Sequence, residues 1–265
     1  MLAVIALAVQ GTLQAQLGLY TSKGTFLLAE CFKFCISSLL SAKDPKGHSF
    51  NSVVLLGISS VIFLVQTNFL LRGIALIANP FLFQLVCQSK LITTALASRG
   101  RSTSLASLVG ILVGIAIVLK DSSTGRKSGG VISPGFTIGV LYVFGASIGS
   151  AIGGKIYEKA ITHEKISMWK TMQIVSAFSI ILLLPSVGEV AKVTTNPLCL
   201  LALCSQIAGG YLVAYVVQKH GNLAKVTASS IGIAIQALFS DSRSDFVTLI
   251  GTFLVLVSSF AMNKR

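Results

Sequence analysis

A lysine in the middle of an apolar run is the most informative feature of the sequence. Lys90 lies in FQLVCQSKLITTAL, residues 83–96, a segment typical of a membrane-spanning helix. An ammonium at the centre of such a helix costs roughly 2.5–3.5 kcal/mol, so it indicates a functional site by default. Phe83, Cys87 and Lys90 are spaced by four and three residues and therefore share one helix face. We interpret Lys90 as a ligand for an anion, above all phosphate; a snorkelling or ion-paired lysine is the alternative.

A second charged group occurs in another apolar run. Glu30 and Lys33, in AECFKF, are three residues apart and can form an ion pair on one face of a helix. Two interpretations remain open. The two side chains either neutralise each other or lie beside a substrate.

Polar amides also occur in the third apolar run and at the start of the ninth. Gln66 and Asn68 lie in VQTNFLL, and Asn222 and Lys225 lie in HGNLAKV. Amides at these positions can bind a base or a sugar by hydrogen bonds. They can equally bind neighbouring helices within a membrane.

Catalytic chemistry has little support in the residue pattern. The three histidines, His48, His163 and His220, all fall in expected connections, and no nucleophile–base pair or metal-ligand spacing accompanies them. A phosphate-cradling GxxxxGK[ST] loop is absent from the sequence. We therefore expect no enzyme activity, no metal and no cofactor. The net charge of +13 is scattered in short clusters, which argues against nucleic acid as a partner.

Composition places these residues in an all-α membrane protein, with the lipid bilayer as its surroundings. The chain of 265 residues is 53% hydrophobic and 11% charged, and its mean hydropathy is +0.83. We expect about ten transmembrane helices in a single domain over residues 1–265. The apolar runs are 1–20, 24–42, 52–77, 79–98, 104–120, 132–156, 167–185, 198–217, 224–240 and 246–262.

A short internal similarity suggests how these helices are arranged. ALASRGRSTS begins at Ala95 and ALFSDSRSDF begins at Ala237, and each is followed by a new apolar run. The two copies lie five spans apart, so they cross the membrane in opposite senses. The pattern predicts two inverted five-helix halves, about 1–120 and 131–262, a plan common among secondary transporters.

Two stretches of the sequence resemble a known family. VQTNFLLRGIALIANPFLFQLVCQSKLITTAL, residues 65–96, and GGYLVAYVVQKHGNLAKVTASS, residues 209–230, are similar to segments of nucleotide-sugar transporters. The branch with the most similar pattern carries CMP-sialic acid, UDP-galactose and UDP-N-acetylglucosamine. The resemblance extends over nearly the whole chain.

The resemblance implies the drug/metabolite transporter fold in a Golgi membrane or, alternatively, an endoplasmic-reticulum membrane. It implies alternating access that exchanges a cytosolic pyrimidine nucleotide sugar for a luminal nucleoside monophosphate. By the same resemblance, Lys90 and Lys225 would meet the phosphates, and Asn68 and Asn222 would help to bind nucleotide or sugar. A homodimer is compatible with it.

Several positions depart from the family pattern, and some of them fall at the expected site. Phe83 and Cys87 stand where the family has tyrosines that line the cavity. The departures are Leu19, Phe83, Cys87, Thr171, Gln218 and Gly221. These changes remove hydrogen bonds and stacking from the expected site. Two alternatives therefore stay open: a related exporter of another metabolite or drug, and a membrane partner that no longer transports.

Overall fold

Nearly every residue that the computed structural model describes belongs to a helix, and no strand occurs among these residues. The prediction of an all-α protein is confirmed. The described residues are 2–42, 49–77, 79–97, 105–124, 134–164, 166–239 and 246–263. The helices are α1 (Leu2–Gln16), α2 (Lys23–Ser41), α3 (Phe50–Ile77), α4 (Pro80–Val86), α5 (Ser89–Ala97), α6 (Leu105–Thr124), α7 (Pro134–Glu164), α8 (Met168–Leu183), α9 (Val190–Thr194), α10 (Pro197–Phe239) and α11 (Phe246–Asn263), with 3₁₀ turns η1 (Gly18–Tyr20) and η2 (Leu184–Glu189).

The predicted apolar runs fall on these helices, with two differences in continuity. The fourth run, 79–98, is divided into α4 and α5. The eighth and ninth runs join in α10, which bends at Gly221. Most of the repeated motif, from residue 98 and from residue 240 onward, lies outside the described residues.

Five of the described helical segments are long and apolar enough to cross a membrane. They are Lys23–Ser41, Phe50–Ile77, Gly135–Thr162, Met168–Glu189 and Pro197–Asn222. The outer surface of the bundle is apolar as well. Phe253 on α11 is 66% exposed and Leu141 on α7 is 65% exposed, for example. Apolar side chains on the outside of a bundle are expected where lipid is the solvent.

Local sequence explains where several of the helices begin. Ser22 and Thr25 form a reciprocal capping box at the start of α2. Asn79 accepts hydrogen bonds from the backbone N–H groups of Phe81 and Leu82, and Pro80 occupies the first turn of α4. Both signals end the preceding turn sharply and fix the direction of the next helix.

Small residues allow α3 and α7 to pack at close range. Gly145, Gly149 and Gly153 recur once per turn on α7 and face α3. A Cβ added to Gly145 would come within 3.0 Å of the ring of Phe69, and one added to Gly153 within 2.9 Å of the ring of Phe63. Such a row of glycines brings helix backbones together where no hydrophobic force drives them.

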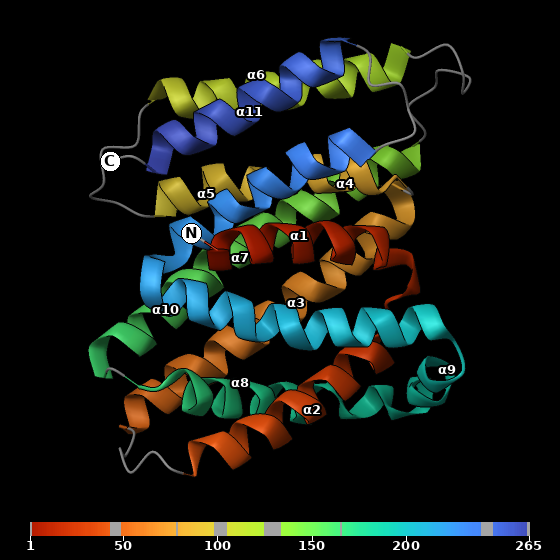
Figure 1. The fold of residues 1–265 in the computed structure, drawn as a ribbon. Helices are drawn as coiled ribbons and strands as arrows, with labels where there is room; N and C mark the ends of the chain where they lie inside the picture. Colours follow the sequence, from red (N-terminus) through yellow and green to blue (C-terminus); the bar gives the residue numbers. More distant parts are fainter. Residues whose placement is uncertain are drawn as a thin grey trace.

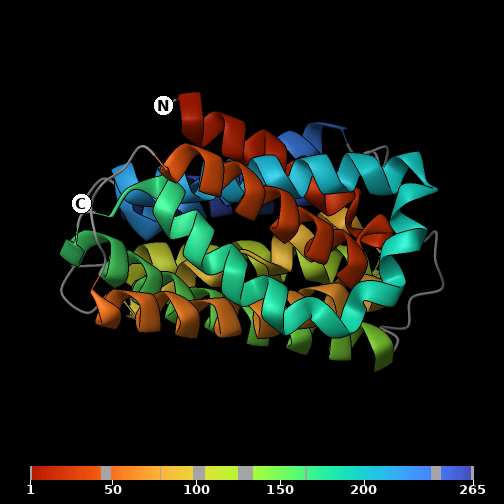
Figure 2. The same cartoon turned by 90° about the horizontal axis from the view of Figure 1, so that it is seen from below.

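The helices form a layered bundle with two outer pairs and a central group. α6 lies beside α11 along one edge, and α2 lies beside α8 along the opposite edge (Figure 1). Between them, α3 packs on α7 and α1 packs on α10. Seen from below, the start of α1 and the end of α11 lie toward the same end of the bundle (Figure 2). The central group encloses the candidate site.

Candidate functional site

A cavity of about 220 Å³ lies between the central helices. Its walls come from α1, α3, α4, α5, α7 and α10, and Phe26 of α2 also lines it. Most of the wall is apolar, and a few polar side chains point into it. This composition is typical of a binding site for a small organic molecule.

Lys90 and Lys225 line this cavity together. Their sequence neighbours Leu91 and Val226 pack in one core cluster, which brings the two lysines to the same depth in the bundle. Each lysine is half-buried, and the described part of the chain offers neither of them an ion pair. None of the described lining residues is acidic. The cavity therefore contains two positive charges, which a bound anion would neutralise.

A break between α4 and α5 positions the first lysine. The chain tightens to 3₁₀ hydrogen bonding at this point: Gln88 N donates to Leu85 O (2.9 Å) and Lys90 N donates to Cys87 O (3.1 Å). Phe83, Cys87 and Lys90 nevertheless all line the cavity, as their spacing predicts. Phe83 and Cys87, which stand where the family pattern has tyrosines, therefore lie at the site itself.

A polar network holds the broken segment against α10 and α11. Ser230 Oγ donates to Gln88 Oε1 (2.9 Å) and lies 2.9 Å from Ser259 Oγ. Gln88 Nε2 donates to Ser229 Oγ (3.4 Å). On the other side, Ser89 Oγ donates to Ser147 Oγ of α7 (2.8 Å). These side-chain bonds tie the segment beside Lys90 to α7, α10 and α11.

Gly221 sets the direction of the helix that carries the second lysine. Its φ is 80° and its ψ is 172°, a conformation that is essentially restricted to glycine. A Cβ at this position would lie 3.0 Å from Glu158 Oε1. Gly221, one of the departures from the family pattern, is therefore the residue at which α10 bends, one turn before Lys225.

The three amides expected at the site lie outside the cavity lining. Asn68 Nδ2 donates to Leu64 O of its own helix (3.0 Å). Gln66 packs near Gly149, and Asn222 is buried against Gly154. The described structure therefore places Asn222 at the α7–α10 contact, three residues before Lys225, where it can fix the position of that lysine.

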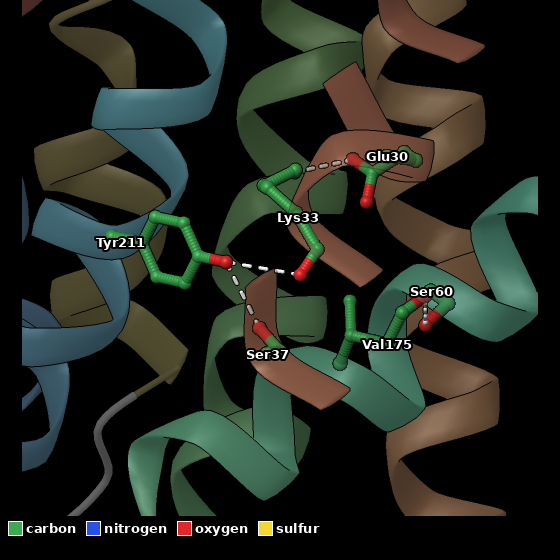
Figure 3. A network of polar contacts seen from close by, with 6 residues as sticks. All are labelled: Glu30, Lys33, Ser37, Ser60, Val175 and Tyr211. Carbon is green, nitrogen blue, oxygen red and sulfur yellow. Dashed lines mark hydrogen bonds and ion pairs between the residues drawn. The ribbon is translucent and has the colours of Figure 1, made fainter. Parts of the chain in front are cut away.

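The other predicted pair is separate from the cavity. Lys33 Nζ lies 2.5 Å from Glu30 Oε1, and the two side chains are 10% and 13% exposed. Tyr211 of α10 donates to the backbone carbonyl of Lys33 (2.9 Å) and also contacts Ser37 Oγ (3.0 Å; Figure 3). The prediction that Glu30 and Lys33 pair on one helix face is confirmed, and neither residue lines the cavity.

Three glutamines of the cavity wall were not predicted from the sequence. Gln10 and Gln14 lie one turn apart on α1, and Gln206 lies on α10. Gln10 Nε2 donates to Ser205 O (3.1 Å), which ties the two helices together. Two amides at i and i+4 in an otherwise apolar first span, VQGTLQ, are the signal that could have identified this wall.

Comparison with known proteins relates this site to a transporter family. A family model described as nucleotide-sugar transporter matches residues 2–263. The UDP-N-acetylglucosamine transporter of Homo sapiens is 26% identical over 97% of this chain and 89% of its own length. The UDP-galactose transporter of Schizosaccharomyces pombe is 30% identical over 69% of this chain and 57% of its own length. These relatives are transporters and not enzymes.

The fold also has a counterpart among solved structures. One crystal structure superposes with a TM-score of 0.60 over 98% of both chains, at 11% sequence identity. Similarity at this level of identity concerns the arrangement of the helices alone.

Proposed function

Because the chain belongs to the nucleotide-sugar transporter family, we propose that it exchanges a pyrimidine nucleotide sugar for the matching nucleoside monophosphate. The relatives named above are transporters of UDP-N-acetylglucosamine and UDP-galactose, which favours a uridine nucleotide. We place the protein in the Golgi membrane, with the endoplasmic reticulum as the alternative. The exchange brings the nucleotide sugar from the cytosol to the lumen and returns the monophosphate.

The pair of lysines in one cavity is the observation that carries this proposal. Lys90 and Lys225 line the same cavity, and no described lining residue is acidic. Every nucleotide sugar carries negatively charged phosphate, and a nucleoside monophosphate retains one phosphate group. Both cargoes thus offer the group that this cavity is built to receive.

The same charges explain why transport would be an exchange. Two unpaired ammonium groups in a low-dielectric cavity oppose closure, because closing removes them further from water. A bound phosphate neutralises them and allows the cavity to close. The empty carrier then crosses between its two states slowly, while the loaded carrier crosses in either direction.

The packing of the helices supports two inverted halves with alternating access. The halves would be α1 to α6 and α7 to α11, with α10 counted as two spans that meet at Gly221. Exchanging the halves converts the α3–α7 contact into the contact between α10 and α1. The α2–α8 and α6–α11 pairs are each converted into themselves. A symmetric set of contacts gives two packings of similar energy, one open to each side.

The hydrogen bond between Gln88 and Ser230 supports the same symmetry. The two residues are 142 positions apart, and the starts of the repeated motif, Ala95 and Ala237, have the same separation. Residues that correspond in two halves can touch only near the axis that relates the halves. The bond therefore lies where a pseudo-twofold axis would pass.

We assign direct contact with the cargo to Lys90, Lys225, Phe83 and Cys87, which line the cavity. Asn222 would position Lys225 through its contact with Gly154. Gln66 and Asn68 lie on α3 on either side of Thr67, which lines the cavity, and would support the same region.

A second candidate is a related exporter of another small anion. Its support is the presence of Phe83 and Cys87 in the cavity wall, where the family pattern has tyrosines. A thermal-shift panel separates the two candidates: stabilisation by UMP and UDP-sugars supports the first, and stabilisation by unrelated organic anions alone supports the second.

Counterflow in proteoliposomes tests the proposal. Purified protein is reconstituted, preloaded with UMP, and given labelled UDP-N-acetylglucosamine outside. We expect uptake at least tenfold above that of liposomes preloaded with AMP or with buffer. Uptake that is independent of the internal nucleotide would contradict exchange, and no uptake of any UDP-sugar or UMP would contradict the proposed function.

A further inference from the structure

A chain of hydrogen bonds crosses the centre of the bundle beside Lys90. Ser89 Oγ of α5 donates to Ser147 Oγ of α7 (2.8 Å). The residue before Ser89 is Gln88, whose Oε1 accepts from Ser230 Oγ of α10 (2.9 Å). Two residues further along α10, the backbone carbonyl of residue 232 accepts from a hydroxyl of α1 (3.0 Å). We call these residues the polar layer: Thr12, Gln88, Ser89, Ser147, Ser230 and Gly232.

Each of these three bonds joins one proposed half to the other. The first half supplies α1 and α5 with the segment before it, and the second half supplies α7 and α10. On each helix the members lie within three consecutive positions, so the layer is less than one helical turn thick. Its side chains are buried or half-buried. Buried polar groups in a membrane keep their hydrogen bonds, because no water replaces a lost partner.

The polar layer is symmetric under exchange of the halves. Gln88 and Ser230 are 142 positions apart, and Lys90 and Gly232 have the same separation. The contact between Gln88 and Ser230 is therefore converted into itself. Because α1 and α7 are the first helices of their halves, the α5–α7 bond is converted into the bond between α10 and α1. Both of these bonds are already present, so the exchange leaves the layer bonded.

The helices on either side of the layer are not symmetric. Five residues of α1 line the cavity, whereas Ser150 is the single lining residue that the described part of α7 provides. α7 instead packs closely on α3, where a Cβ added to Gly139 would lie 3.0 Å from Leu76 Cβ. Exchange of the halves converts this α3–α7 contact into the contact of α1 with the first part of α10. The cavity would then be lined by α7 and closed along α1.

Resting on the proposed function, we infer that the polar layer is the pivot of the transport cycle. Its hydrogen bonds persist in both open states, while the α3–α7 and α1–α10 contacts away from it open in turn. A contact on the axis between two rocking halves moves least, so the buried polar groups never lose their partners during the change. Lys90 follows the layer directly in the sequence, which keeps this ligand for phosphate at a constant depth.

Two engineered disulfides test this inference. Ser89→Cys with Ser147→Cys joins α5 to α7 within the layer, where the native hydroxyls are 2.8 Å apart. Leu76→Cys with Gly139→Cys joins α3 to α7 at a level about 12 Å along α7 from Ser147. Each protein is oxidised in proteoliposomes with copper phenanthroline, and UMP/UMP exchange is compared before and after reduction with dithiothreitol. Mass spectrometry of the proteolytic peptides verifies that each bond has formed.

We expect the disulfide within the layer to leave exchange within about threefold of the reduced protein. The disulfide between α3 and α7 should lower exchange at least twentyfold, because this contact must open in each cycle, and reduction should restore it. Loss of exchange on oxidation of the Ser89/Ser147 variant overturns the inference. Unchanged exchange on oxidation of the Leu76/Gly139 variant overturns it as well.

Controls separate this inference from the proposed function. Exchange by the reduced form of each variant serves as its test of folding, and the oxidised wild type controls for the native cysteines. If the reduced Leu76/Gly139 variant does not exchange UMP, Arg72→Cys with Tyr142→Cys, bridged by a short bifunctional thiosulfonate, replaces it. Arg72 Nη1 lies 3.3 Å from Tyr142 Oη on the exposed side of the same contact. Failure of UMP/UMP exchange by the reduced wild type would instead overturn the proposed function.

Discussion

Lys33 and Lys90 both lie in apolar helices, but they differ in what their ammonium groups can reach. Lys33 contacts the Glu30 carboxylate at 2.5 Å, and Tyr211 donates a hydrogen bond to its backbone carbonyl (Figure 3). Gly210 lies beside its side chain. Lys90 opens into the central cavity beside Lys225, and the described residues give it no counter-ion. The charge of Lys33 is neutralised within the chain. The charges of Lys90 and Lys225 are neutralised only when an anion binds in the cavity.

The contrast teaches how an intramembrane lysine should be interpreted. Insertion cost alone marks both residues as unusual. The partner decides the role: a carboxylate one turn away neutralises Lys33, and a second lysine in the same cavity makes Lys90 a candidate ligand for an anion. The charge of Lys33 is neutralised within α2, and the two unpaired lysines remain available to an anionic ligand.

The largest effect expected from this comparison is on transport. Lys90→Met should reduce UDP-N-acetylglucosamine exchange by at least a hundredfold, because the phosphates lose a charged partner in a low-dielectric site. The matched control changes the paired region. The double variant Glu30→Gln with Lys33→Met removes a lysine and its counter-charge together. Its exchange should stay within about threefold of the wild type. Counterflow at equal protein density in the liposomes measures both.

The reverse result would invert the assignment of the two regions. If the Glu30/Lys33 double variant lost exchange and Lys90→Met retained it, the paired residues would form the substrate site. Circular dichroism in detergent checks that both proteins remain helical.

The second effect is on stability and belongs to the paired region. Glu30→Gln alone leaves the Lys33 ammonium buried without a counter-ion, which should cost about 3 kcal/mol. The double variant removes the charge and should recover to within about 1 kcal/mol of the wild type. Unfolding in detergent, followed through the midpoint of thermal denaturation, measures both. Equal losses in the single and double variants would mean that the pair contributes through packing and not through charge.

Much of the architecture could be predicted because it depends on local patterns. The apolar runs of the sequence predicted where the helices lie. The spacing of Phe83, Cys87 and Lys90 indicated a shared face, and all three line the cavity. The Glu30–Lys33 pair followed from the geometry of one helix turn.

What the sequence could not provide depends on contacts between distant segments. Asn68 was expected at the site, but its amide bonds to its own helix. Gln14 and Gln206 were missed because their meeting across one cavity requires the packing of α1 on α10. The bend at Gly221 was also missed, because a glycine in HGNLAKV reads only as a departure from a family pattern until its positive φ is known.

The smallest expected effect concerns the bend at Gly221, which sets the position of the unpaired Lys225. Gly221→Ala places a Cβ at a φ of 80°, and 3.0 Å from Glu158 Oε1, and should destabilise the protein by about 1–3 kcal/mol. Since Lys225 follows one turn later, the variant should also raise the half-saturating concentration of UMP several-fold. Gly188→Ala is the matched control, because a Cβ there meets no atom within 4 Å. If thermal denaturation and UMP exchange were the same for both variants, Gly221 would not be what holds Lys225 in the cavity wall.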